Sequence, residues 1–121
     1  MKLVALFLIS LLPSTYHRTD ECEQLRPWLD VGAQLTGWDT TVMQKIAWRE
    51  SRCLPMRSET SDSGHLQIND INHQFLSEMW GMPVDSTMLM DPAVNVLAAA
   101  ELFNYWERVA GDGYLPWAAT R

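Results

Sequence analysis

The chain has 121 residues, of which 47% are hydrophobic and 20% are charged, so it can fill one small core and is not intrinsically disordered. Nine Lys and Arg against fifteen Asp and Glu give a net charge of −6. This charge argues against binding to nucleic acid, because such proteins present a basic face to the phosphates. The two Cys and three His lack the spacing of metal ligands, so we expect no metal site.

The first fifteen residues have the features of a secretory signal peptide. Lys2 supplies a positive charge, and residues 3–12 form an unbroken apolar run. This run is about half of the roughly 20 residues that cross a bilayer, so we expect no stable membrane span. We therefore predict a signal peptide over residues 1–15, one domain over residues 16–121, and a secreted or periplasmic location. A buried amino-terminal helix or a retained anchor is the alternative.

The next segments predict two helices. Apolar residues are scattered over residues 22–35, and Gly37 is placed to end this helix. Asp39 is placed to cap the start of a second helix over residues 40–53. Pro55 ends that helix because the residue before a proline avoids the helical conformation.

The second half of the chain is also mainly helical. Residues 56–68 are polar and turn-rich at their start and are expected to form no more than a short hairpin. Residues 68–80 are expected to be helical in their second half. Asp91 and Pro92 are placed to begin a helix that runs to about Ala110. Its predicted inward face comprises Val94, Leu97, Ala98, Leu102, Tyr105 and Val109. The pattern predicts an all-α fold, with a short β-hairpin around residues 56–68.

One carboxyl group stands on an apolar helix face. Glu50 follows Met43, Ile46 and Ala47 by seven, four and three residues, so it shares the side that packs inward. A carboxyl that is desolvated and unpaired has a raised pKa and can act as a general acid near neutral pH. A salt bridge to an arginine, or a place at the rim of the stripe, is the alternative.

Three motifs occur in order along the chain. WRESRCLP spans residues 48–55, GHLQIN spans residues 64–69, and DPAVNV spans residues 91–96. Together they resemble the soluble lytic transglycosylase and goose-type lysozyme-like superfamily. The family motifs are Glu-Ser near a helix end, Gly-Leu-Met-Gln on a turn beside the cleft, and a helix that begins Asp-Pro-x-x-Asn. The resemblance covers roughly residues 38–110 and implies a lysozyme-like α domain.

The resemblance implies an exported peptidoglycan-cleaving enzyme, a lytic transglycosylase acting on the β-1,4 bond between N-acetylmuramic acid and N-acetylglucosamine. Glu50 falls on the catalytic acid, which protonates the glycosidic oxygen and then acts as a base on the sugar's own C6 hydroxyl. Ser51 falls on the family serine that supports the helix end. No cofactor is needed for this chemistry. The expected partner is the glycan strand of peptidoglycan, and we expect a monomer.

Further residues are candidates for substrate binding. Gln67 falls on the family glutamine of the cleft, whose amide can bind an acetamido group, although bracing of the backbone is the alternative. Asn69 and Ser58 fall at or next to cleft positions. Trp117 follows a proline in an irregular tail and is our candidate for an aromatic ring that stacks on a sugar.

Several alternatives stay open at this point. His65 and Leu66 replace the usual Leu and Met of the family turn, and the family's A-Y-N-A-G segment is not found. A hydrolase commonly uses a second carboxylate, for which Asp62 is a better candidate than Asp70. A muramidase of the same fold, a catalytically silent glycan-binding relative, and an unrelated helical secreted protein are therefore the alternatives.

Two cysteines in an exported chain predict one disulfide, between Cys22 and Cys53. It would tie the amino end of the domain to the exit of the helix that carries Glu50. A closed loop of about 31 residues corresponds to roughly 3.5–4 kcal/mol of stabilisation in the chain-entropy treatment. Two free thiols are the alternative.

Overall fold

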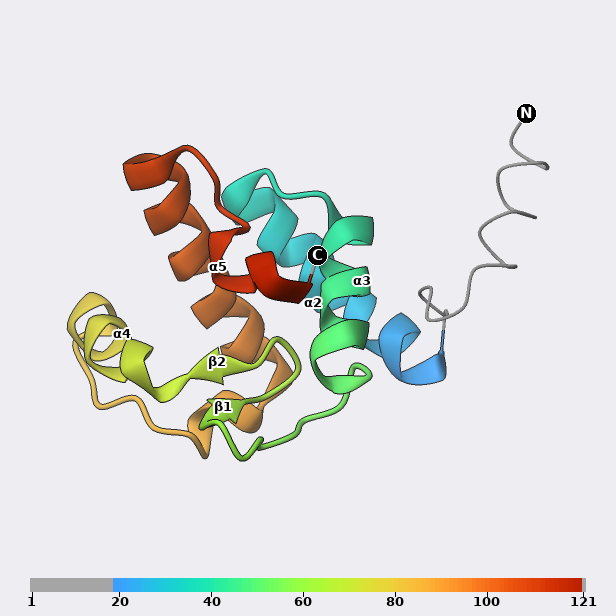
Figure 1. Ribbon diagram of the computed structural model, residues 1–121, viewed down its shortest axis with the longest axis horizontal. Coiled ribbons are helices and arrows are strands. Elements are labelled where there is room, and N and C mark those ends of the chain that lie inside the picture. The colour runs from blue at the N-terminus through green and yellow to red at the C-terminus, as the bar shows by residue number, and fades with distance from the viewer. Residues whose placement is uncertain (1–18, 121) are drawn as a thin grey trace.

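The computed structural model describes residues 19–120, and these residues form a mainly helical fold with one small hairpin (Figure 1). The predicted signal peptide, residues 1–15, lies outside the described residues. In chain order the elements are α2 (Asp20–Thr36), α3 (Thr40–Ser51), β1 (Asp62–Ser63), β2 (Ile68–Asn69), the 3₁₀ helix η1 (Asp70–Asn72), α4 (His73–Trp80), the 3₁₀ helix η2 (Met88–Met90), α5 (Pro92–Ala110) and the 3₁₀ helix η3 (Leu115–Thr120). The predicted all-α fold class with a short hairpin is confirmed.

Local capping signals set most helix ends. The side chain of Asp39 accepts a hydrogen bond from the Val42 N–H at the start of α3, and the side chain of Asp91 caps α5 in the same way. Gly37 ends α2 in the left-handed conformation, with φ +80°. The helix over residues 40–53 is shorter than predicted. It ends at Ser51 because the next two residues both have positive φ, +59° and +61°.

α2, η2 and η3 pack against α5, α3 packs against α2, and the hairpin lies at the first turns of α5. α2 contacts both α3 and α5, and β2 contacts α5. In Figure 1 the carboxyl end of α3 points toward the hairpin, while α4 lies on the far side of β2. The largest fully buried apolar side chains come from every layer: Leu29, Met43, Ile46, Leu66, Ile68, Leu76, Leu89 and Val96. The core therefore joins the helices to the hairpin.

The predicted inward face of α5 is partly wrong. Ala98 and Leu102 are buried as expected, but Leu97 and Val109 are exposed. The buried arc of the helix is wider and rotated, and comprises Asn95, Val96, Ala98, Ala99, Ala100, Leu102 and Phe103. The physical reason is that α5 is covered by α2, η2, η3 and β2, so several sides of one helix are buried at once.

The predicted disulfide is confirmed. Cys22 and Cys53 are joined, with their Cα atoms 5.1 Å apart, so the start of α2 is tied to the segment that follows α3. Such a bond is compatible with an oxidising compartment outside the cytosol. Within residues 19–120 no helix combines the length and the apolar character that a membrane crossing requires.

Candidate functional site

The turn between β1 and β2 requires a glycine. Gly64 has φ +83°, and a Cβ at this position would overlap the side-chain amide of Asn95 and the carbonyl oxygen of Leu89. Gln67, three residues later, also lies in the left-handed region, with φ +50°. We call residues 64–67 the site turn. The backbone of the site turn is constrained by its left-handed residues and by the atoms packed against Gly64.

The end of α3 is bonded directly to the site turn. The Ser51 hydroxyl donates a hydrogen bond of 2.7 Å to the carbonyl oxygen of His65, and it accepts one from the Leu54 N–H. Ser51 is buried, so this contact is shielded from water. The expectation that Ser51 supports the helix end therefore agrees with its position.

Helix α5 holds the site turn through one buried amide. Asn95 is 0% exposed. Its Oδ1 accepts a hydrogen bond of 2.8 Å from the Leu66 N–H. Its Nδ2 donates bonds of 2.9 Å to the carbonyl oxygens of Ser63 and Leu89. The asparagine of the third motif thus satisfies three backbone groups, and all three motifs meet at the site turn.

Glu50 lies in the last turn of α3, immediately before Ser51. The stripe of Met43, Ile46 and Ala47 is buried as predicted, but Glu50 is only half-buried. It therefore stands at the solvent end of the stripe. Because Ser51 is bonded to His65, the helix end that carries Glu50 is fixed beside the turn that carries Gln67. Part of Glu50 is exposed to solvent.

The amide of Gln67 does two things. Its Nε2 donates hydrogen bonds to the carbonyl oxygens of Met56 (3.0 Å) and Gly64 (2.9 Å), so the amide braces the backbone of the turn. Its Oε1 makes no hydrogen bond within residues 19–120 and can accept one from a ligand. The bracing role that the sequence left open is therefore present, together with a free acceptor.

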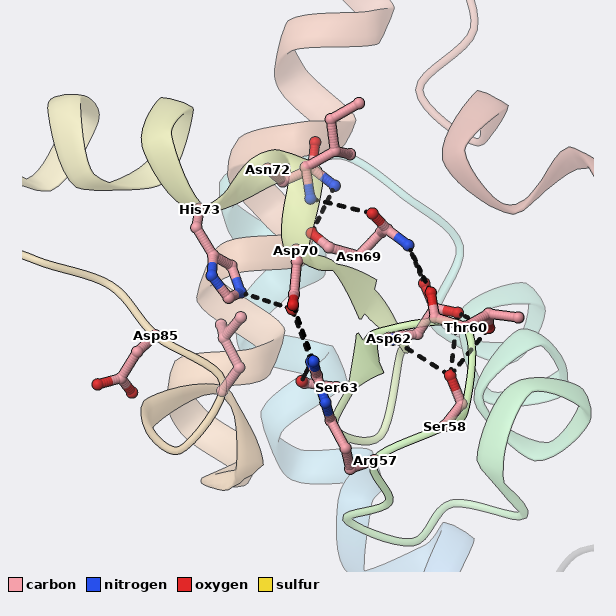
Figure 2. A network of polar contacts seen from close by, with 12 residues as sticks. Arg57, Ser58, Thr60, Asp62, Ser63, Asn69, Asp70, Asn72, His73 and Asp85 are labelled. Atoms are coloured by element: carbon pink, nitrogen blue, oxygen red, sulfur yellow. Dashed lines mark hydrogen bonds and ion pairs between the residues drawn. The ribbon is translucent and has the colours of Figure 1, made fainter.

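Ser58, Asn69 and Asp62 come together on the polar loop of the hairpin (Figure 2). The Asp62 carboxylate accepts hydrogen bonds from Ser58 Oγ (3.1 Å), from the Thr60 hydroxyl and from Asn69 Nδ2 (2.9 Å). The Asn69 Oδ1 in turn accepts a bond from the Ile71 N–H. The polar groups of these predicted binding residues are thus used mainly to hold the loop.

A second polar contact spans the two sides of the hairpin and was not found by sequence reasoning. The Arg57 guanidinium donates to both oxygens of Asp70, at 2.6 and 2.8 Å, and His73 Nε2 lies 3.2 Å from the same carboxylate (Figure 2). The hydrogen bond and the charge of Arg57 hold the pKa of Asp70 below its ordinary value, and the same bond raises the pKa of Arg57. Arg57 and Asp70 are thirteen residues apart, and no periodic pattern in the sequence links them.

Trp117 does not offer an open ring to a sugar. It is 2% exposed, and its Nε1 donates a hydrogen bond of 2.8 Å to the carbonyl oxygen of Leu66. The expected stacking role is therefore wrong for this arrangement, because the indole is needed to hold the site turn from the side of η3. Another tryptophan, Trp106, borders a hollow of about 470 Å³. The hollow is lined by Asn69, Ile71, Asn72, Trp106, Leu115 and Pro116.

The imidazole of His65 is buried beside the end of α3. It is 7% exposed, and burial lowers its pKa, while the charge of Asp91 acts in the opposite direction. Its Nδ1 has no hydrogen-bond partner within the described residues. Its place beneath the end of α3 agrees with a structural role. Between Thr19 and Thr120, no group of three or more His, Cys, Asp or Glu side chains is arranged to hold a metal ion.

Searches with this chain against protein-family models, against curated proteins and against solved structures find no match. The functional assignment therefore depends on the motifs and on how the fold arranges them.

Proposed function

We propose that the protein is an exported peptidoglycan-cleaving enzyme, a lytic transglycosylase in which Glu50 is the general acid and base. The observation that supports this most directly is the hydrogen bond from Ser51 to His65, which fixes the Glu50 end of α3 against the turn that carries Gln67. Asn95 of the third motif holds the other side of the same turn. The three motifs therefore meet at one turn, as the proposed site requires.

The reaction needs only one carboxyl group. Glu50 gives its proton to the glycosidic oxygen as the bond from that oxygen to C1 of N-acetylmuramic acid breaks. The carboxylate then takes the proton of the C6 hydroxyl, whose oxygen bonds to C1 of the same sugar. The product is a 1,6-anhydro sugar, no water is consumed, and Glu50 returns to its protonated form. In this proposal the Oε1 of Gln67, which makes no hydrogen bond within residues 19–120, accepts an acetamido N–H of the substrate.

A muramidase of the same fold is the second candidate. It is favoured by the presence of Asp62 on the hairpin that carries Gln67, since a second carboxylate can activate water. Against it, the Asp62 carboxylate already accepts three hydrogen bonds, from Ser58, Thr60 and Asn69. The transglycosylase therefore remains the preferred assignment.

The test is digestion of purified peptidoglycan sacculi by the wild-type protein, Glu50→Gln and Glu78→Gln, with the released muropeptides identified by mass spectrometry. Glu78 is an exposed glutamate on α4 and serves as the matched control. We expect Glu50→Gln to lose about 100-fold or more of the activity, because a positioned general acid contributes roughly 10²–10⁴-fold. Glu78→Gln should retain wild-type activity, and the products should carry anhydro ends.

Three other outcomes would contradict the proposal in different ways. Reducing ends would identify a muramidase. Equal activity of Glu50→Gln and the wild type would remove Glu50 from the mechanism. Sacculi that bind the wild-type protein but release no muropeptide would indicate a glycan-binding protein. Equal thermal unfolding of the three proteins is the control for folding.

A further inference from the structure

An apolar stripe on α2 is left without a partner within the described residues. Trp28, Val31 and Leu35 follow one another at spacings of three and four residues, so they lie on one side of the helix. Leu97 of α5 is exposed as well. These four side chains are between 42 and 53% exposed. Single exposed apolar residues are ordinary, but a continuous helical stripe marks an interaction surface.

Two hollows extend this stripe at its ends. The first, of about 280 Å³, lies between the start of α2, the segment that follows α3 and the start of α5. It is lined by Glu21, Gln24, Leu25, Trp28, Cys53, Leu54, Pro55, His65 and Pro92. The second, of about 220 Å³, lies between Leu35 of α2 and the 97–104 segment of α5. We call the stripe and the two hollows together the α2–α5 groove. Fourteen residues of helix separate Glu21 from Leu35, a rise of about 21 Å, which matches roughly four turns of a bound helix.

The rim of the groove is acidic. Glu21 lines the first hollow, and Glu101, which accepts a hydrogen bond from Trp80 Nε1, lines the second. Arg26, the one basic residue of α2, is turned away, because its guanidinium binds Gln44 Oε1 at 2.6 Å. Arg108 is the one basic residue of α5. It lies beyond the groove, with its guanidinium over the ring of Tyr105.

These charges decide between the occupants of the groove. A second copy of this chain would bring another net charge of −6 against an acidic rim. A basic segment would instead meet opposite charges at both ends while its apolar side chains cover the floor. A helix that presents apolar residues at every third and fourth position matches both the length and the stripe.

We propose that the α2–α5 groove binds an amphipathic helix of a partner protein, with an apolar face against Trp28, Leu35 and Leu97 and with Lys or Arg beside Glu21 and Glu101. Neither hollow is lined by Glu50 or Gln67, although His65 of the site turn lines the first. The proposal therefore does not depend on the proposed enzymatic function.

The probe is a fluorescent eighteen-residue helical peptide with Leu at positions of one face and Lys elsewhere, followed by anisotropy. Two further peptides are compared: the same composition in scrambled order, which removes the apolar face, and a version with Glu in place of Lys. We expect the Lys peptide to bind at least about tenfold more tightly than either. Leu35→Glu and Leu97→Glu should each weaken its binding by about tenfold. Val109→Glu, an equally exposed apolar position elsewhere on α5, should leave it unchanged.

The proposal is overturned if the Lys peptide does not bind, if the scrambled peptide binds equally well, or if the Glu peptide does. It is also overturned if Val109→Glu weakens binding as much as Leu35→Glu. Sedimentation of the wild-type chain tests self-association, and a dimer that Leu35→Glu dissociates would assign the groove to a second copy instead. Equal thermal unfolding of the wild type and the groove variants is the control for an intact fold.

Discussion

The hairpin region contains two neighbouring parts that are held by different interactions. The site turn, residues 64–67, is fixed by buried hydrogen bonds from neutral side chains: Ser51, Asn95 and Trp117. The polar segments on either side of it, residues 57–62 and 69–70, are held by more exposed polar and charged groups, chiefly Arg57 with Asp70. Buried polar groups are costly to leave unpaired, whereas exposed ion pairs contribute little and are screened by salt. The comparison indicates that the geometry around Glu50 depends on the buried set.

Replacing Asn95 should break the buried set with the largest effect. Asn95→Ala leaves the Leu66 N–H and the carbonyl oxygens of Ser63 and Leu89 without this partner. Each of the three buried groups costs about 1–3 kcal/mol when unpaired, so we expect a loss of at least about 3 kcal/mol in the free energy of unfolding, measured by urea denaturation.

The matched control is the same substitution at the end of η1. Asn72 makes one hydrogen bond of 3.3 Å, to the carbonyl oxygen of Asn69, and is only half-buried. Asn72→Ala should therefore change the free energy of unfolding by less than about 1 kcal/mol. Similar losses for both variants would show that the two parts of the hairpin are not held differently.

Removing the disulfide tests the same turn from the side of α3. The Cys22→Ala, Cys53→Ala double variant frees the segment that follows Ser51, while the hydrogen bonds to the turn remain. We expect a loss of about 3.5–4 kcal/mol in the free energy of unfolding, because a loop closed by residues 31 apart is released in the unfolded chain. Urea denaturation of the oxidised wild type against the variant measures it. A change below about 1 kcal/mol would contradict the chain-entropy argument.

The exposed pair should give the smallest effect, with a defined dependence on pH. Arg57 holds the pKa of Asp70 below its ordinary value of 3.8. The stabilisation from this pair is therefore fully present above about pH 4 and is lost as the pH falls through the lower pKa of the folded state. Asp70→Asn should be less stable than the wild type at pH 6 by a small margin that disappears in strong acid. Thermal unfolding from pH 2 to pH 7 measures this difference.

Salt distinguishes this pair from the buried contacts. At 1 M NaCl the difference between Asp70→Asn and the wild type should shrink, because the pair is exposed. The effect of Asn95→Ala should stay the same, since its hydrogen bonds join neutral groups away from water. A salt-sensitive Asn95→Ala or a salt-insensitive Asp70→Asn would contradict the assignment of the two parts.

The sequence predicted those features that depend on neighbouring residues. Capping side chains at Asp39 and Asp91 and the left-handed Gly37 placed the helix ends to within a few residues, because the groups that they satisfy lie within one turn. The disulfide was predicted because the chain offers only two cysteines. The motifs drew attention to Glu50, Gln67 and their order along the chain.

Only the tertiary structure decided which of these residues meet. Trp117 is bonded to Leu66, fifty-one residues away, and Arg57 to Asp70 across a loop, and neither contact leaves a periodic signal in the sequence. Which sides of α5 are buried, and therefore that Leu97 is exposed, was likewise set by the elements that pack against this helix. A helix end is specified within a few residues of chain, whereas burial and long-range hydrogen bonds depend on the packing of separate segments, which the local pattern does not contain.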